Sequence, residues 1–319
     1  MGQVRGPRID FPPVTTVVAS ASHVQRRFGR VLALSDVSFE LERGVTGLLG
    51  ANGAGKTTLI SLLLGVLRPD AGRLSVLGMD PLQAGWKLRQ RIGYAPEDDR
   101  FPPDVKANEL VRHFAEMRGI PHRAAVVRAS EVLFEVGLGE ERFRPIGTMS
   151  TGQRQRVKLA QALVHDPELV LLDEPTNGLD PIQRDDMLAM VRRIGTELGF
   201  TVLISSHLLG EVEQVSDNIV MLEGGKVARS GSVKSLLGGE TPLVVEVVSG
   251  ARRLAELLVA KGFGAAAKDD LLLTVPSSRD GVQDAVVAGV VELDLEMRRM
   301  EHGQATLGEL FDLEEVPSR

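Results

Sequence analysis

The stretch "GANGAGKTT", Gly50 to Thr58, constrains this chain more than any other. It fits the pattern G-x-x-x-x-G-K-[ST], in which the backbone N–H groups of a glycine-rich loop surround phosphate oxygens. The loop follows a short apolar run, "VTGLLG" (45–50), and opens an apolar helical pattern that we expect to end at the turn "RPDAG" (68–72). Strand, glycine loop and helix form the context that the motif requires. The alternative is a glycine-rich turn that matches by chance.

The side chains of the loop have separate expected tasks. Lys56 is expected to reach the β- and γ-phosphates of a nucleotide, and the Thr57 hydroxyl to ligate Mg²⁺. Glycines let the backbone approach the phosphates without a Cβ in the way, and the helix adds its positive N-terminal end. The residues expected to contact the nucleotide are Gly50, Asn52, Gly53, Gly55, Lys56, Thr57 and Thr58.

A second motif supplies the complementary acids. The apolar run "ELVLLD" (168–173) ends in Asp173, where a carboxylate would hold the Mg²⁺ shell. Glu174 comes next and would accept a proton from, or orient, the attacking water. Two idle, exposed acids at a strand end are the alternative interpretation.

The apolar patterns predict an α/β fold: a P-loop NTPase core with a parallel sheet, an antiparallel β-subdomain and a helical subdomain. The runs at 45–50, 168–173 and 200–206 are expected to be buried parallel strands. The alternating pattern before the loop predicts antiparallel strands, and the stretch 98–165 is mostly helical in pattern. "NIVMLEGGKVARSG" predicts a hairpin that turns at Gly224–Gly225.

The chain is expected to divide into an N-terminal tail (1–14), an ATPase domain (15–239) and a C-terminal α+β domain (240–319). From about 241 the pattern reads strand, helix, two strands, helix, strand, helix. This order fits a split βαβ arrangement.

The composition excludes several kinds of partner and site. The net charge is −6, so no basic surface for nucleic acid is expected. There is no cysteine, which excludes disulfides, thiolate metal sites and cysteine nucleophiles. No apolar run approaches the roughly 20 residues that span a bilayer. We therefore expect a cytosolic chain that reaches a membrane only through a partner.

The stretch "MSTGQRQRVKLAQAL", from Met149, decides among nucleotide-binding classes. Together with the motifs above it resembles the ABC ATPase family, whose signature is usually Leu-Ser-Gly-Gly-Gln. The resemblance implies that this helix start faces the γ-phosphate of ATP held by a second subunit. The signature residues are Ser150, Thr151, Gly152 and Gln153. Thr151 departs from the usual glycine, and taken alone Ser150 and Gln153 would be an ordinary capping box.

Further family motifs follow in order. By the resemblance, Asp180 in "NGLD" (177–180) senses the partner subunit, and His207 in "SSHLLGEVE" contacts the γ-phosphate. Phe28 in "RRFGR" stands where the family stacks an aromatic ring on adenine. A polar loop histidine and a strand-edge phenylalanine are the ordinary alternatives.

One position departs from the commoner pattern. After "RIGYAP" the family most often has glutamine, whereas this chain has Glu97. A carboxylate also ligates Mg²⁺, so Glu97 is taken as a metal ligand and a catalytic residue beside Glu174. The resemblance includes members with glutamate here.

The resemblance spans roughly 16–239 and implies an ATP-binding, ATP-hydrolysing subunit of an ABC transporter. The "TLGELF" ending is similar to that of exporter subunits, so export is the expected direction. All motifs are intact on one chain, which favours a homodimer that closes on two ATP molecules. A separate membrane permease would dock near Glu97 and 98–120, at the cytoplasmic face of the cell membrane.

Two other functions compete. A soluble ABC protein of ribosomes or DNA would carry two cassettes, an inserted coiled coil or zinc-binding cysteines, and none of these features is present. A nucleotide-binding regulator without turnover would lack Lys56 or Glu174, and both are present.

Overall fold

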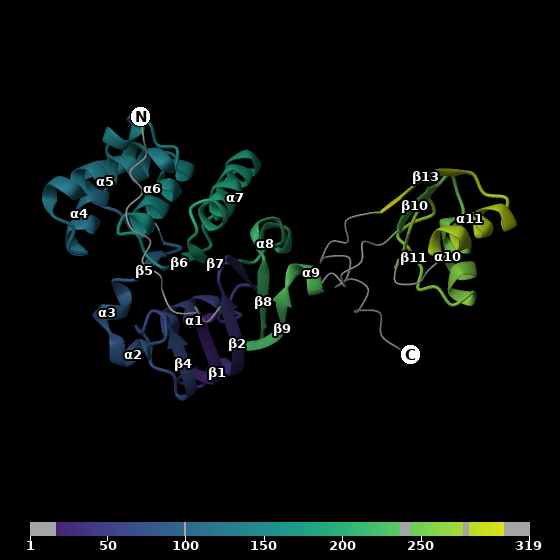
Figure 1. Cartoon of the computed structure of the whole chain (residues 1–319), viewed down its shortest axis with the longest axis horizontal. Coiled ribbons are helices and arrows are strands. Elements are labelled where there is room, and N and C mark those ends of the chain that lie inside the picture. The colour runs from purple at the N-terminus through teal and green to yellow at the C-terminus, as the bar shows by residue number, and fades with distance from the viewer. Residues whose placement is uncertain (1–16, 99, 237–242, 277–280, 303–319) are drawn as a thin grey trace, which may run out of the picture. The chain divides into compact units, whose positions relative to one another are not determined.

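The computed structural model describes residues 17–98, 100–236, 243–276 and 281–302. The chain divides into two compact units, one up to Ser230 and one from Gly231, each described here by itself (Figure 1). The expected tail (1–14), the expected boundary at 239–240 and the last expected helix (306–314) lie outside the described residues.

A six-stranded sheet with the order β5-β6-β7-β3-β8-β9 forms the centre of the larger unit. Its strands are β3 (Val45–Leu49), β5 (Ile92–Ala95), β6 (Leu169–Asp173), β7 (Thr201–Ser206), β8 (Asn218–Glu223) and β9 (Lys226–Ser232). The first five in the sheet order are parallel. Every residue of β3, β6 and β7 is buried, as expected for a parallel sheet covered on both faces.

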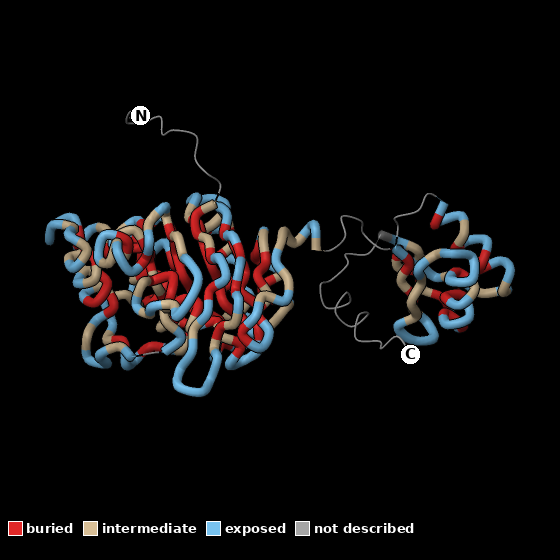
Figure 2. Tube along the Cα trace, turned by 90° about the horizontal axis from the view of Figure 1, so that it is seen from below, coloured by how far each residue is buried: buried red, intermediate tan, exposed pale blue. Residues whose placement is uncertain are grey.

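Two apolar clusters cover the two faces of this sheet. Along β6, Val170 and Leu172 join a cluster with the helices between residues 107 and 196, whereas Leu169 and Leu171 join one with the helix after the phosphate loop and an antiparallel sheet. Figure 2 shows the buried residues gathered inside each unit. The predicted α/β class and parallel core are confirmed.

The antiparallel sheet has the order β2-β1-β4. Its strands are β1 (Val17–Phe28), β2 (Val31–Glu42) and β4 (Ala71–Val76). The stretch 98–165 is mostly helical, as its pattern predicts, and the larger unit has further helices before and after that stretch. Apart from the helix after the phosphate loop, these helices are α2 (Pro81–Ala84), α3 (Trp86–Arg89), α4 (Ala107–Met117), α5 (His122–Glu135), η1 (Glu140–Phe143), η2 (Ile146–Thr148), α6 (Thr151–Leu163), α7 (Pro181–Thr196) and α8 (Leu209–Val215).

The helix after the phosphate loop is shorter than expected. Helix α1 spans Lys56–Leu63, four residues short of the predicted end at Leu67. Gly65 has a φ of 66°, a left-handed conformation that ends helices. A Cβ on Gly65 would lie 2.2 Å from the carbonyl oxygen of Pro81, so only glycine fits at this close approach.

The smaller unit is α+β. After α9 (Val233–Leu236), its sheet has the order β11-β12-β10-β13, and every paired neighbour is antiparallel. Its other elements are β10 (Leu243–Val247), α10 (Ala251–Ala260), β11 (Ala266–Ala267), β12 (Leu272–Val275), α11 (Val282–Glu292) and β13 (Met297–His302). Both α10 and α11 contribute buried residues to its core. Within the described ranges of the chain, no helix has the length and apolar character to cross a membrane.

Candidate functional site

The phosphate loop joins β3 to α1 and depends on glycine at two positions. Gly53 and Gly55 have φ angles of 84° and 106°, which side chains rarely allow. A Cβ on Gly55 would lie 2.6 Å from Leu34 Cδ2, whereas one on Gly53 would meet nothing within 4 Å. Helix α1 begins at Lys56, and among the described residues no side chain caps its first N–H groups. The loop therefore offers backbone donors at a helix start, the arrangement that binds anions.

Lys56 folds back over this loop. Its Nζ donates to the carbonyl oxygens of Gly50 (2.5 Å) and Ala51 (3.3 Å). The same atom lies 3.0 Å from Oε1 of Glu174, and both side chains are 6% exposed. A buried lysine is thereby held against the loop by a buried carboxylate.

Asp173 ends β6 in register with Ser205 on β7. The Ser205 hydroxyl donates to Asp173 Oδ1 (2.7 Å) and accepts from the backbone N–H of Glu174 (2.9 Å). Burial raises the pKa of the Asp173 carboxyl, while hydrogen bonds from Ser205 and Thr57 and the charge of Lys56 oppose that rise. The nearby charge of Glu174 raises it further.

Glu174 connects this strand end to His207. Its backbone φ of 48° is unusual for a residue with a side chain. Its Oε2 lies 2.9 Å from Nδ1 of His207, which follows β7 and is 40% exposed. The carboxylate of Glu174 thus contacts Lys56 on one oxygen and His207 on the other.

Oxygen atoms around Thr57 fit a hard divalent cation. Oδ2 of Asp173 is buried and receives no hydrogen bond of ordinary geometry from the described residues. The Thr57 hydroxyl is close enough to the Asp173 carboxyl to lower its pKa by hydrogen bonding. One or two carboxylates, a hydroxyl and nucleotide phosphates are a ligand set typical of Mg²⁺.

Glu97 approaches from the loop after β5. Its Oε1 accepts a hydrogen bond from Asn177 Nδ2 (3.0 Å), and its backbone oxygen accepts one from the buried Lys158 Nζ (2.7 Å). The Glu97 side chain is exposed and faces the hollow above the phosphate loop.

That hollow has a volume of about 440 Å³. It is lined by Val31, Leu32, Ala33, Asn52, Gly53, Gly55, Lys56, Thr57, Thr58, Glu97, Glu174, Gly224 and Gly225. The sequence interpretation missed the segment 31–33 as part of the site. The feature of the sequence that could have indicated this segment is the short turn that joins β1 to β2. The hairpin places residues 31–33 beside the Gly224–Gly225 turn, where Ser35 donates its backbone N–H to the Gly225 oxygen (2.7 Å).

Phe28 is not among the residues that line this hollow. It ends β1 opposite Val31, is 45% exposed, and carries the Arg26 guanidinium 4.6 Å above its ring. The expected stacking on adenine therefore stays a prediction.

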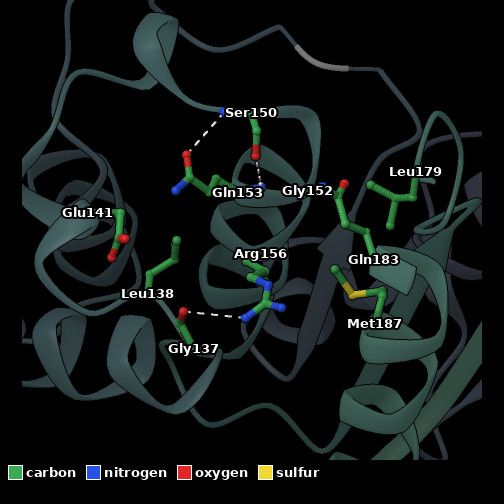
Figure 3. A pocket seen from close by; sticks show the side chains of 10 residues that line it. All are labelled: Gly137, Leu138, Glu141, Ser150, Gly152, Gln153, Arg156, Leu179, Gln183 and Met187. Carbon is green, nitrogen blue, oxygen red and sulfur yellow. Dashed lines mark hydrogen bonds between the residues drawn. The ribbon is translucent and has the colours of Figure 1, made fainter. Parts of the chain in front are cut away.

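The signature residues lie at the start of α6, where Ser150, Gly152 and Gln153 line a separate hollow of about 240 Å³ (Figure 3). The Ser150 hydroxyl accepts from the Gln153 N–H, and the Gln153 side chain accepts from the Ser150 N–H, so the capping box is present. A Cβ on Gly152 would lie 2.8 Å from Gln183 Oε1, so this glycine permits close approach of α7. Thr151 is partly buried and its hydroxyl accepts from Arg154 (3.1 Å).

Asp180 caps α7 by accepting a hydrogen bond from the Gln183 N–H (2.9 Å). It is exposed. Figure 3 shows Leu179 and Gln183 beside the start of α6. Leu179 and Gln183 line the same hollow as the signature residues, and none of the residues that line it lines the phosphate hollow.

This fold and this loop define a P-loop nucleotide-binding protein. Residues 34–177 match the family described as ABC transporter. The chain is 37% identical over 231 residues to the linearmycin resistance ATP-binding protein LnrL of Bacillus subtilis (strain 168), covering 71% of this chain and 74% of the relative. It belongs to the ABC transporter family, as one of its ATP-binding subunits, and is an ATPase.

Two further similarities extend over more of the chain. The daunorubicin resistance ATP-binding protein DrrA3 of Streptomyces coeruleorubidus is 32% identical over 292 residues, 90% of this chain and 92% of the relative. The structure of cbiO1 from Clostridium perfringens, part of the ABC transporter complex cbiONQ, has a TM-score of 0.65 and 26% identity. It covers 78% of this chain and 98% of the matched one.

Proposed function

We propose that this chain is the ATP-hydrolysing subunit of an exporter, in which closure of two copies on ATP drives a separate membrane permease. The observation that carries the proposal is the complete set of motifs on one chain: the phosphate loop, the Asp173–Glu174 strand end, His207 and the capped signature helix. Relatives named for linearmycin resistance, daunorubicin resistance and Nod factor export support the outward direction.

At the phosphate end, Lys56 and the loop N–H groups bind the β- and γ-phosphates, with Asn52 and Thr58 beside them. Phe28 contacts the adenine. Glu174 orients the attacking water and takes its proton, and His207 holds Glu174 and donates to the γ-phosphate. These contacts act mainly by positioning and by charge, as phosphoryl transfer requires.

Thr57, Asp173 and Glu97 are the proposed Mg²⁺ ligands. Bound with ATP, the ion supplies positive charge that offsets the charge of the phosphates. Among the described residues, Oδ2 of Asp173 is buried and has no hydrogen-bond partner of ordinary geometry. A buried carboxylate oxygen without such a partner costs free energy, which supports Asp173 as a Mg²⁺ ligand.

A second copy of the chain completes each site. Ser150, Gly152 and Gln153 line a different hollow from the one above the phosphate loop, which supports the use of the signature on a nucleotide held by the other copy. The start of α6 carries the positive end of a helix and is suited to a γ-phosphate. Asp180, at the start of α7, is proposed to contact the partner subunit.

The membrane permease is proposed to dock near Glu97 and the segment 98–120, placing the chain at the cytoplasmic face of the cell membrane. To test this, the tagged full chain is extracted from native membranes in mild detergent. A stoichiometric protein with several membrane spans is the expected partner. Recovery with ribosomes or DNA-repair proteins, or of a chain wholly outside the membrane fraction, would contradict the transporter proposal.

A further inference from the structure

Glu211 is a buried acid for which the proposed function gives no task. It lies in the first turn of α8 and is 5% exposed. It does not line the phosphate hollow. Because an unpaired buried carboxylate costs several kcal/mol, its partners need explanation.

Three side chains converge on this carboxylate, from the turn after β6, the end of β7 and helix α7. Thr176 Oγ1 donates to Oε2 (2.8 Å), and Ser206 Oγ donates to the same oxygen (2.6 Å). Arg184 Nε lies 3.2 Å from Oε1. Thr176 and Ser206 are themselves buried, so these bonds are shielded from water.

Each partner adjoins a residue of the candidate site. Thr176 follows Glu174 by two residues and begins the turn that leads to Asp180. Ser206 directly precedes His207, and its hydroxyl also accepts from the Leu208 N–H (3.0 Å), so it fixes the backbone on both sides of that histidine. Arg184 lies in the first turns of α7, the helix that Asp180 caps.

We propose that Glu211 is a positioning residue that ties the turn carrying His207 to the turn leading to Asp180. The proposal deepens the function proposed above and rests on it. Hydrogen bonds are directional, so one carboxylate bound to both turns fixes their mutual orientation, whereas apolar packing of the same volume would leave it loose. A displacement of the Asp180 turn is then passed to His207 through the Thr176–Glu211–Ser206 bonds.

A matched pair of variants tests this link. Thr176→Val removes the hydroxyl at nearly constant shape, whereas Thr176→Ser retains it. Glu211→Gln removes the charge that Arg184 faces and one acceptor. In wild-type background, Thr176→Val and Glu211→Gln are expected to lower kcat of ATP hydrolysis about tenfold, with the KM for ATP changed less than threefold. Thr176→Ser is expected to keep kcat within about twofold.

A second readout does not depend on hydrolysis. The imidazole resonances of His207, assigned by their loss in His207→Gln, are expected to move in Thr176→Val and Glu211→Gln and to stay in place in Thr176→Ser. Melting curves of each variant show whether a loss of activity merely follows unfolding. Because two bonds reach one oxygen, Thr176→Val combined with Ser206→Ala should lose less than the product of the single effects.

The proposal is overturned if the His207 resonances are unchanged in both variants, or if kcat falls only in proportion to the unfolded fraction. These outcomes leave the proposed function intact. A wild-type chain without ATP hydrolysis would instead remove the proposed function, while the resonances of His207 would still report on the link to Glu211.

Discussion

The Nζ atom of Lys56 lies 3.0 Å from Oε1 of Glu174, although the two residues follow strands, β3 and β6, between which β7 lies in the sheet. Both side chains are almost fully buried. In an interior of low dielectric such a pair interacts strongly, and each partner would be costly alone. Any phosphate that approaches Lys56 therefore competes with Glu174 for the same ammonium.

Replacing the Glu174 carboxylate should separate binding from turnover. We expect Glu174→Gln to reduce ATP hydrolysis at least about 100-fold, because a positioned base is lost. ATP affinity should rise, because Lys56 no longer has a competing carboxylate. With saturating Mg-ATP the variant should form a stable dimer, measured by size-exclusion chromatography with light scattering.

The matched control for this change is Glu135→Gln, at an exposed position of α5. It should leave hydrolysis and mass unchanged. A Glu174→Gln protein that stays monomeric with saturating Mg-ATP would show that the proposed two-copy site is wrong.

Asp173→Asn should stabilise the protein while removing its response to Mg²⁺. Burial raises the pKa of this carboxyl, so the folded state binds its proton more tightly than the unfolded state. The cost of the charge therefore appears as pH rises above the unfolded pKa. We expect Tm at pH 7.5 to rise, and the gain in Tm to shrink near pH 4. Melting curves at both pH values, with and without Mg-ATP, measure this change. A Tm that falls by the same amount at both pH values would contradict the prediction.

Gly47 and Gly210 provide opposite tests of packing. A Cβ on Gly47, in β3, would lie 2.0 Å from Cγ1 of Val212 in α8. Gly47→Ala should therefore cost about 1–3 kcal/mol in the free energy of unfolding. A Cβ on Gly210 meets nothing within 4 Å, so Gly210→Ala in the same helix should be neutral or slightly stabilising. Urea titration of both variants distinguishes them, and equal midpoints would refute the close contact.

His165 should make the protein sensitive to mild acid. Burial, with the charge of Arg118, lowers its pKa to about 4, from an ordinary 6.5. The folded state therefore resists protonation, so its stability is complete above pH 6.5 and falls as pH drops towards 4, by at most roughly 3 kcal/mol. His165→Gln should flatten this part of the stability profile. An unchanged slope between pH 6.5 and 4 in the variant would assign the acid sensitivity to other groups.

Much of the larger unit could be predicted from local patterns. Apolar runs gave the buried strands β3, β6 and β7, because parallel strands covered on both faces leave no polar positions. The S-x-x-Q spacing predicted the cap of α6, since both hydrogen bonds are local in sequence. The predicted end of α1 was wrong. The helix stops before Gly65, and the close approach of Gly65 to Pro81 cannot be seen in any local pattern.

The contacts within the site could not be predicted in the same way. The carboxylate of Glu174 reaches both Lys56 and His207, and this double contact depends on strand order and on an unusual backbone φ. The place of Val31 and Leu32 in the hollow depends likewise on how the β1–β2 hairpin lies beside Gly225. Glu211 lies in the stretch that follows His207, but the sequence did not predict a role for it. Its three partners come from separate segments of the chain and meet only in the folded structure.

The pairing of β3 also sets an order of events during synthesis. Val45 pairs with Val202 and Thr46 with Asn218, so the strand that carries the phosphate loop has both neighbours late in the chain. A nascent chain grows from its N-terminus, and pairings between distant segments form slowly. The loop that holds the phosphates thus leaves the ribosome before either of the two strands that will flank β3.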